Sequence, residues 1–155
     1  MHTFVRLSTT DPRSRDLLDE YFAERAVGFE GGDYIVTHPD PARFVDPDGA
    51  FVVLLDGDTP VGCGGVRALS PTRFEIKHVF LRPAARGAGW GRRLLETLES
   101  EARALGAREL VLDTNATLAA AGGLYRSSGY VEIEPYNTNP NANHWYGKKL
   151  TDSPR

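Results

Sequence analysis

Residues 79–93, VFLRPAARGAGWGRR, decide the fold of this chain. Before them, an apolar pattern predicts a strand from Arg73 to Leu81. After them, apolar residues recur at helical spacing from Trp90 until Gly106, which suits the end of a helix. A strand that enters a helix through a glycine-rich turn is typical of an anion site, because backbone N–H groups converge there and the helix dipole favours negative charge.

The spacing of the glycines in this turn limits the choice of ligand. The backbone can approach a phosphate closely at Gly87, Gly89 and Gly91. A dinucleotide-binding G-x-G-x-x-G pattern fails because position 92 is Arg92, and the P-loop pattern is absent. The pattern present is R-x-x-G-x-G, and positive charge is available at Arg86, Arg92 and Arg93. These features predict a ligand with a pyrophosphate, and the alternative is a merely flexible turn.

Three motifs in order resemble the GCN5-related N-acetyltransferase (GNAT) family. They are the strand Val79-Phe80-Leu81 followed by Arg-Pro, the R-x-x-G-x-G turn, and the later Leu124-Tyr125-Arg126-Ser-Ser-Gly129-Tyr130. The resemblance spans roughly 51–150. It implies an α/β fold of the GNAT (acyl-CoA N-acyltransferase) type, in which helices cover both faces of a mixed, twisted sheet. Residues 1–155 would then form a single N-acetyltransferase domain, and CoA would enter where two parallel strands splay apart.

The pattern of the rest of the chain agrees with such an order of elements. Asp11-Pro12 predicts a helix start, and the turn Asp56-Gly57-Asp58 predicts a hairpin. A short helix is expected at Thr117–Ser127 before two closing strands. The strands expected besides Arg73–Leu81 are Thr3–Leu7, Ala50–Leu55, Pro60–Leu69, Leu110–Leu112, Tyr130–Tyr136 and His144–Leu150.

The resemblance also implies how acetyl-CoA would be held. The backbone of Val79, Phe80 and Leu81 would pair with the pantetheine arm. The pyrophosphate would lie on the turn, formed by Arg86, Gly87, Ala88, Gly89, Trp90, Gly91 and Arg92. Many relatives carry Asn or Gln seven residues before the tyrosine, where this chain has Leu118. We therefore treat Asn115, or else Thr117, as a replacement for that contact.

The catalytic residues are predicted in part from chemistry and in part from the resemblance. Tyr125 would protonate the departing CoA thiolate, since a phenol can donate to sulfur while its ring packs inside; the alternative is a core tyrosine. The base that takes the amine proton is Glu75, with Asp113 as second candidate and His78 as third. With equal weight, Glu75 is interpreted as a solvated strand residue or as an ion-pair partner of Lys77 or Arg73 across the sheet.

Composition excludes several other classes of function. The formal net charge of −3 argues against a nucleic-acid partner, and no apolar run is long enough to span a membrane. The single cysteine, Cys63, lies in an apolar strand and is interpreted as a small buried residue; the histidines lack metal-ligand spacing, so no metal is expected. We expect a cytoplasmic protein that is a monomer or homodimer.

The predicted activity is transfer of an acetyl group to a primary amine of a small molecule, amino acid or peptide. A non-catalytic acyl-CoA sensor and an enzyme that uses a longer acyl-CoA are the alternatives. The acceptor would be chosen by the segments Tyr21–Asp48 and Tyr136–Asn143. The first contains Glu24, Glu30, Asp33, Asp40 and Asp46, which would suit a cationic amine or form a solvated acidic loop.

Overall fold

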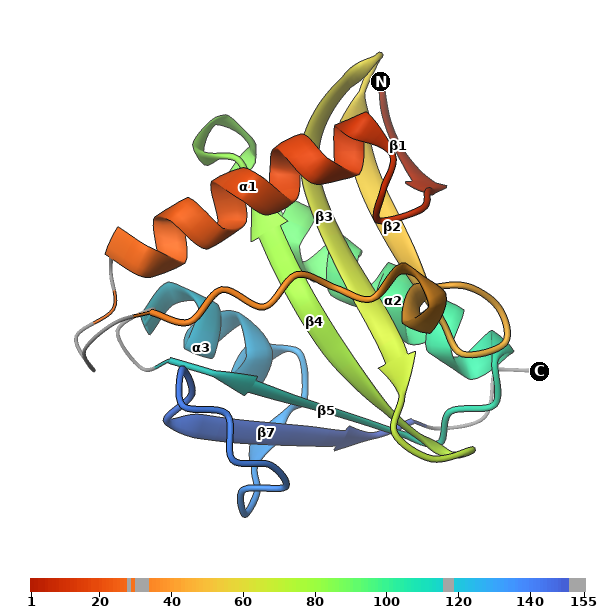
Figure 1. The fold of residues 1–155 in the computed structure, drawn as a ribbon, viewed down its shortest axis with the longest axis vertical. Coiled ribbons are helices and arrows are strands. Elements are labelled where there is room, and N and C mark those ends of the chain that lie inside the picture. The colour runs from red at the N-terminus through yellow and green to blue at the C-terminus, as the bar shows by residue number, and fades with distance from the viewer. Residues whose placement is uncertain (28, 30–33, 116–118, 151–155) are drawn as a thin grey trace.

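A computed structural model describes residues 1–27, 29, 34–115 and 119–150. It contains a seven-stranded sheet in the order β1-β2-β3-β4-β5-β7-β6 (Figure 1). The strands are β1 (His2–Arg6), β2 (Gly49–Asp56), β3 (Thr59–Ala68), β4 (Arg73–Leu81), β5 (Glu109–Thr114), β6 (Val131–Glu132) and β7 (His144–Lys149). The helices are α1 (Pro12–Val27), α2 (Trp90–Ala104) and α3 (Ala119–Ser127), with short 3-10 helices η1 (Pro41–Phe44) and η2 (Pro83–Ala85).

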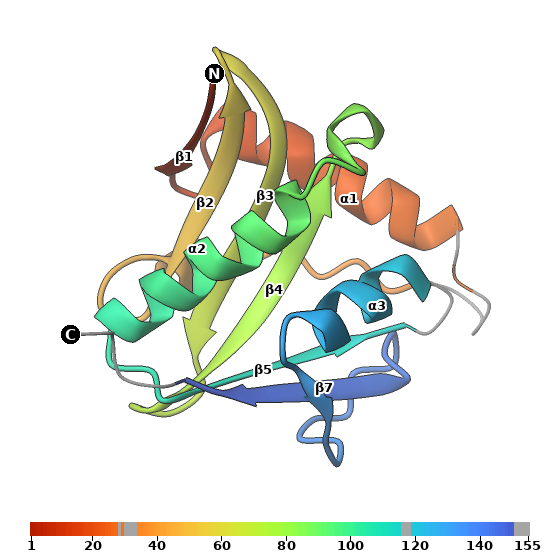
Figure 2. The same ribbon diagram turned by 180° about the vertical axis from the view of Figure 1, so that it is seen from behind.

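The helices cover both faces of the sheet, which confirms the predicted architecture. Figure 1 shows α1 crossing one face, and Figure 2 shows α2 and α3 on the other. Leu17, Leu18 and Phe22 of α1 pack in one cluster with Val53 of β2. Leu94, Leu95 and Leu98 of α2 pack in a second cluster with Val52. The run of apolar residues in β2 follows from this arrangement, because alternate side chains of that strand enter different cores.

The hairpin predicted at Asp56-Gly57-Asp58 is confirmed, and Gly57 in its turn has a φ of 61°.

The closing strands differ from the expectation. The prediction of a strand over Tyr130–Tyr136 is wrong, since only Val131–Glu132 is a strand. One further bond, from Ile133 N to the Trp145 oxygen, extends the pairing before Pro135, which has no N–H to donate to a sheet.

The neighbouring strands β4 and β5 are parallel for a short distance and then part. They pair from Arg73–Glu109 to Glu75–Val111, and no pairing is present beyond that point. β4 also carries an irregularity at His78, whose φ of 60° is unusual for a side chain of this size. The register between β3 and β4 shifts opposite it, between Cys63 and Gly65. The strands therefore separate as predicted for the GNAT fold. None of the described helices is long and apolar enough to cross a membrane.

Candidate active site

The glycine-rich turn has the geometry of an open anion cradle. Gly87 and Gly89 have φ angles of 85° and 86°, in the left-handed region that favours glycine. Gly89 caps the start of α2 and offers no side chain to the helix. The first N–H groups of α2 therefore remain available to an outside acceptor. Open space adjoins both glycines, with no atom within 4 Å of an added Cβ. The turn fits the predicted pyrophosphate.

Gly91 has a different role in the same turn. A Cβ on Gly91 would lie 3.0 Å from the Cδ2 atom of Leu124 on α3. Its missing side chain thus permits close packing of α2 against α3. Trp90 also has a packing contact, because its ring stacks on His2 at 4.2 Å.

The arginines of the turn are not equivalent. Arg86 donates to the Glu24 carboxylate at 2.6 and 2.9 Å and to the Leu81 carbonyl oxygen at 2.9 Å, so its charge is compensated by α1. Arg92 is exposed at the start of α2. The Arg93 guanidinium lies over the Trp90 ring, 5.0 Å from its centroid. With respect to the described residues, Arg92 and Arg93 are therefore the cations of the turn without a carboxylate partner.

β4 presents an unpaired edge beside the turn. In the described ranges, Ile76–Leu81 pairs with β3 alone, because β5 has already turned away. Phe80 is buried against the α1 side, whereas Val79 and Leu81 pack against the core on the α2 side. The free backbone edge at Val79–Leu81 is compatible with strand-like pairing to the amides of a pantetheine arm.

Tyr125 lies where the two strands part. It lines a small cavity there together with Val79, Leu112 and Asp113. Burial raises the pKa of its phenol to about 12, which keeps the hydroxyl protonated at neutral pH. The ring also packs against Tyr130, with centroids 6.1 Å apart. The residue thus has the contacts of a core tyrosine and the position of a proton donor.

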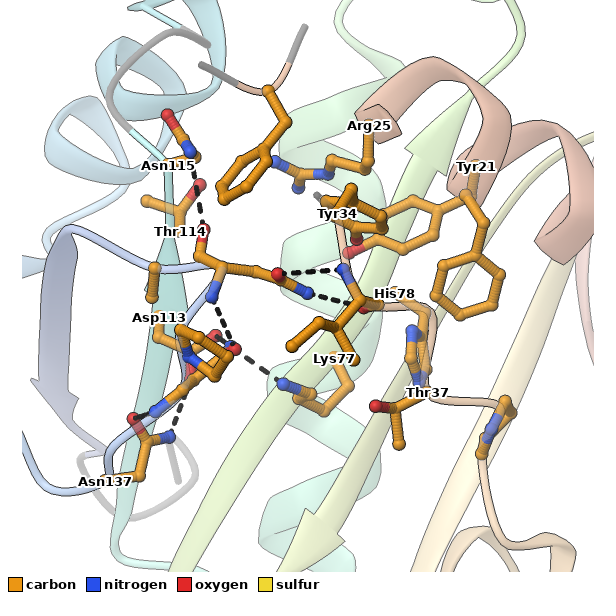
Figure 3. A pocket seen from close by; sticks show the side chains of 18 of the residues that line it. Tyr21, Arg25, Tyr34, Thr37, Lys77, His78, Asp113, Thr114, Asn115 and Asn137 are labelled. Carbon is orange, nitrogen blue, oxygen red and sulfur yellow. Dashed lines mark hydrogen bonds and ion pairs between the residues drawn. The ribbon is translucent and has the colours of Figure 1, made fainter. Parts of the chain in front are cut away.

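A larger cavity of about 410 Å³ adjoins the small one (Figure 3). Its walls come from α1, from the extended segment 34–39, from β4 and β5, and from the loop 137–142. The amide of Asn141 joins two of these walls, since it accepts from Ile35 N at 3.2 Å and donates to Ile35 O at 2.6 Å. The two segments singled out in the sequence as acceptor-determining therefore meet around one cavity.

Asp113 is the carboxylate that lines both cavities. Its side chain is only 6% exposed. Two amide donors hold it: Asn137 Nδ2 at 2.6 Å from Oδ2 and Asn139 Nδ2 at 3.2 Å from Oδ1. Lys77 Nζ lies 3.5 Å from Oδ1. The side chain is thus fixed at the junction of the two cavities.

Glu75 occupies a different environment. Its side chain is 1% exposed, and it is absent from the lining of both cavities. Arg67, its neighbour across β3 and β4, donates to Oε1 at 2.8 and 2.9 Å. The Tyr136 hydroxyl donates to Oε2 at 2.6 Å, and burial with this carboxylate raises the pKa of that phenol. Glu75 is thus an ion-pair residue, but the interpretation as a solvated strand residue and the prediction of Lys77 or Arg73 as the partner are both wrong, because the buried carboxylate pairs with Arg67.

His78 and Cys63 are both buried at the irregularity of β4. Burial, with Lys77 nearby, lowers the pKa of His78 to about 3, so the imidazole is neutral at pH 7. Its Nδ1 atom is buried and has no hydrogen-bond partner in the part of the chain that the structure describes. The Cys63 thiol is buried, and burial raises its pKa. The interpretation of Cys63 as a small buried residue is confirmed.

Asn115 follows β5 and also lines the larger cavity, where its Nδ2 lies 3.4 Å from the Asn141 oxygen. It contacts the acceptor-side loop in this arrangement. Leu118 and Thr117 lie outside the described residues.

The acidic residues expected to suit a cationic amine are dispersed. Glu24 binds Arg86, and Asp40 accepts from Ala42 N at 3.0 Å as the cap of η1. Asp46 is exposed in the loop before β2. Glu30 and Asp33 lie outside the described residues. Within the described ranges, Glu24, Asp40 and Asp46 make local contacts or face solvent, which agrees with the alternative of a solvated acidic segment and not with a carboxylate-rich acceptor site.

Sequence patterns did not identify Arg25, Lys77, Asn137 and Asn139 as site residues. They come from α1, β4 and a late loop, so no local spacing connects them. The one available signal was the loop Asn137–Asn141, whose asparagines are typical of turns.

Comparison with known proteins identifies one family. The model of the acetyltransferase (GNAT) family matches residues 13–130. An IAA acetyltransferase from Azospirillum brasilense is 41% identical over 98 residues, which cover 63% of this chain and 64% of that protein, so the match spans just under two thirds of that relative. The N-alpha-acetyltransferase RimI of Mycobacterium tuberculosis is 32% identical over 133 residues, or 80% of this chain and 82% of that protein. The crystal structure of a GNAT-family acetyltransferase from Staphylococcus aureus superposes with a TM-score of 0.81 at 18% identity, covering 97% of this chain and 100% of that chain.

Proposed function

Because the chain belongs to the acetyltransferase (GNAT) family, we propose that it transfers the acetyl group of acetyl-CoA to the primary amine of a small molecule. The observation that carries the proposal is the position of Asp113 and Tyr125. Both side chains line the small cavity at the parting of β4 and β5, beside the anion cradle of the turn.

The residues present fit acetyl-CoA in three places. The N–H groups at Gly87–Arg92 would bind the pyrophosphate, with Arg92 and Arg93 as nearby cations. The free edge of β4 at Val79–Leu81 would pair with the pantetheine amides. The parting of the strands would then receive the thioester. Acetyl-CoA supplies an activated acyl group there, and the chain's own side chains handle the protons.

We assign the base to Asp113. An amine must lose a proton before or during attack, and the base must lie within reach of the acceptor. Asp113 lines both cavities, whereas Glu75 lines neither and is held by Arg67 and Tyr136. His78 is a weak base, with a pKa of about 3. Asn137 and Asn139 would hold Asp113 in one orientation.

Tyr125 is assigned as the acid. The amine nitrogen attacks the thioester carbon, so a C–N bond forms and the C–S bond breaks in a ternary complex. Asp113 accepts the proton that the nitrogen loses, and Tyr125 donates its hydroxyl proton to the departing sulfur. The balance is one proton moved from the amine to the CoA thiol; afterwards Asp113 releases its proton to solvent and Tyr125 takes one up from solvent. No covalent enzyme intermediate is required.

The dimensions of the larger cavity favour a small acceptor. About 410 Å³ lies within the range of small-molecule sites. The hydrogen bonds between Asn141 and Ile35 tie two of its walls together, which limits the width available to a bulky chain.

The proposed function is tested in two steps. Calorimetry with acetyl-CoA measures binding, and a thiol-release assay against amino acids, polyamines, aminoglycosides and short peptides measures turnover. We expect binding in the micromolar range and CoA release that depends on an amine. Binding without turnover for any amine would favour a sensor, and preference for propionyl- or succinyl-CoA would indicate another acyl donor.

A further inference from the structure

Among the residues that the structure describes, the charges around the larger cavity do not balance. Three cations of this part of the chain line it: Arg25, Arg67 and Lys77. Arg67 is paired with Glu75, and Lys77 lies beside Asp113. Arg25 alone has no carboxylate partner among the residues that the structure describes.

The carboxylates of α1 are already engaged elsewhere. Glu20 binds Arg82, with a shortest distance of 2.6 Å, and Glu24 binds Arg86 at the same distance. Both ion pairs direct these carboxylates towards the end of β4 and the glycine-rich turn. Arg25, one residue after Glu24, instead points into the cavity from the last turn of α1 (Figure 3).

The Arg25 side chain lies among aromatic rings. Its guanidinium lies over the Tyr21 ring, 5.0 Å from the centroid. Figure 3 shows Tyr34 beside it, on the segment 34–39 that lines the cavity. Stacking on an aromatic face holds the planar guanidinium, and its five N–H donors exceed what contact with Tyr21 can use. A partly buried guanidinium without an anion favours binding of one.

Arg25 also lies close to the place where the reaction would occur. It lines the small cavity together with Asp113 and Tyr125 as well as the larger one. An acceptor whose ammonium group faces Asp113 therefore lies within reach of Arg25 through a short connecting chain.

We propose that the acceptor amine also carries a carboxylate, which Arg25 binds, so that the substrate is an amino acid or a related amino-carboxylate. The inference rests on the proposed function and names its substrate class. A carboxylate fits better than a phosphate, because one uncompensated cation matches a single negative charge. The zwitterion then pairs at both ends, its ammonium with Asp113 and its carboxylate with Arg25. Polyamines and aminoglycosides lack the second group.

The test compares amino acids with their amides and their decarboxylated amines. Each set, for example phenylalanine, phenylalanine amide and phenylethylamine, shares one side chain and differs in the carboxylate. Binding is measured by calorimetry in the presence of CoA, and turnover by thiol release. For the wild-type protein, we expect the best amino acid to exceed its amide by about 10- to 100-fold, both in affinity and in the rate of CoA release. This is the size of effect that a charge-assisted hydrogen bond produces.

Three variants assign the effect to Arg25. Arg25→Gln is expected to bring the ratio of acid to amide close to 1, and Arg25→Lys to keep part of it. Arg15→Gln, on an exposed position of the same helix, is the matched control and should keep the wild-type ratio.

The outcomes separate this inference from the proposed function. Arg25-dependent binding of acids without CoA release would support the inference and contradict the proposed function. Equal turnover of acids and amides, or a ratio unchanged in Arg25→Gln, would overturn the inference while the acetyltransferase activity stands. Failure of every amino acid in the panel to bind would also overturn it.

Discussion

Lys77 and Asp113 face each other across the point where β4 and β5 part, with Lys77 Nζ 3.5 Å from Asp113 Oδ1. Each residue lies two positions beyond the last paired residues, Glu75 and Val111. The separation of the strands opens a space between the two backbones, and the ion pair of these two side chains spans it. Asp113 therefore stays close to a cation and two amides while it faces the cavities. Five expected outcomes follow from the geometry around this point.

Asp113→Asn should lower kcat by about 10²- to 10⁴-fold, the usual contribution of a general base. Asparagine preserves the volume and most hydrogen bonds, so acetyl-CoA binding measured by calorimetry should be retained. Asp46→Asn, at an exposed carboxylate, is the control and should retain full activity. A wild-type kcat in Asp113→Asn would contradict the assignment.

Tyr125→Phe should lower kcat by about 10²-fold while the melting temperature changes little, because the ring and its packing remain. Tyr130→Phe is the matched control. Its hydroxyl donates to the buried Glu99 at 2.9 Å, so this variant should lose about 1 kcal/mol of stability yet keep kcat. Thermal unfolding and steady-state kinetics measure both. If Tyr125→Phe instead lowered the melting temperature and kept the wild-type kcat, Tyr125 would be a core residue only.

Glu75→Gln should act mainly on stability. It leaves the Arg67 guanidinium without its carboxylate in a largely buried place, at a cost of about 2–3 kcal/mol. The double variant Arg67→Gln with Glu75→Gln removes the lone charge and should recover most of the stability and activity. Denaturant unfolding and kcat are compared. A folded double variant with no activity would favour Glu75 as the base.

Gly89→Ala should weaken acetyl-CoA binding by about tenfold. The added methyl group meets no atom within 4 Å, so the effect comes from the φ of 86°, which costs an alanine about 1–2 kcal/mol. Gly57→Ala has the same kind of strain, with a φ of 61° and open space, in the hairpin between β2 and β3. Both variants should lose stability, but only Gly89→Ala should raise the KM for acetyl-CoA. If Gly89→Ala and Gly57→Ala had the same KM for acetyl-CoA, the turn would not be part of the acetyl-CoA binding site.

Stability should fall in acid because of His78. Its folded pKa of about 3 lies below the unfolded value of 6.5, so the unfolded chain binds the extra proton between these limits. Stability is therefore fully present above pH 6.5 and is lost as the pH falls towards 3. Between pH 8 and pH 5 the loss from this residue is about 2 kcal/mol. His78→Asn, which tolerates the positive φ, should remove this loss of stability at low pH in urea titrations. An unchanged loss between pH 8 and pH 5 in this variant would contradict the assignment.

The sequence by itself determined the elements whose causes are local. The glycine pattern from Gly87 to Gly91, the period of α2 and the apolar runs of β2 and β5 depend on residues close together in the chain, and all of these elements are present. The resemblance carried by the same residues led to the family that the comparisons show. The strand predicted over Tyr130–Tyr136 ends before Pro135, because proline has no backbone N–H to donate to a neighbouring strand.

Only the tertiary structure decided which polar side chains meet. Asp113 and Glu75 are both acidic strand residues, yet one faces a cavity and the other is enclosed by Arg67 and Tyr136, 61 residues further along the chain from Glu75. Arg25 lines a site with Asp113 because α1 crosses the parting of the strands. Such partnerships depend on register, twist and the path of the loops, which bring distant residues within a few ångströms. No local pattern encodes these distances, so the partners and the charge balance of the cavity follow from the fold alone.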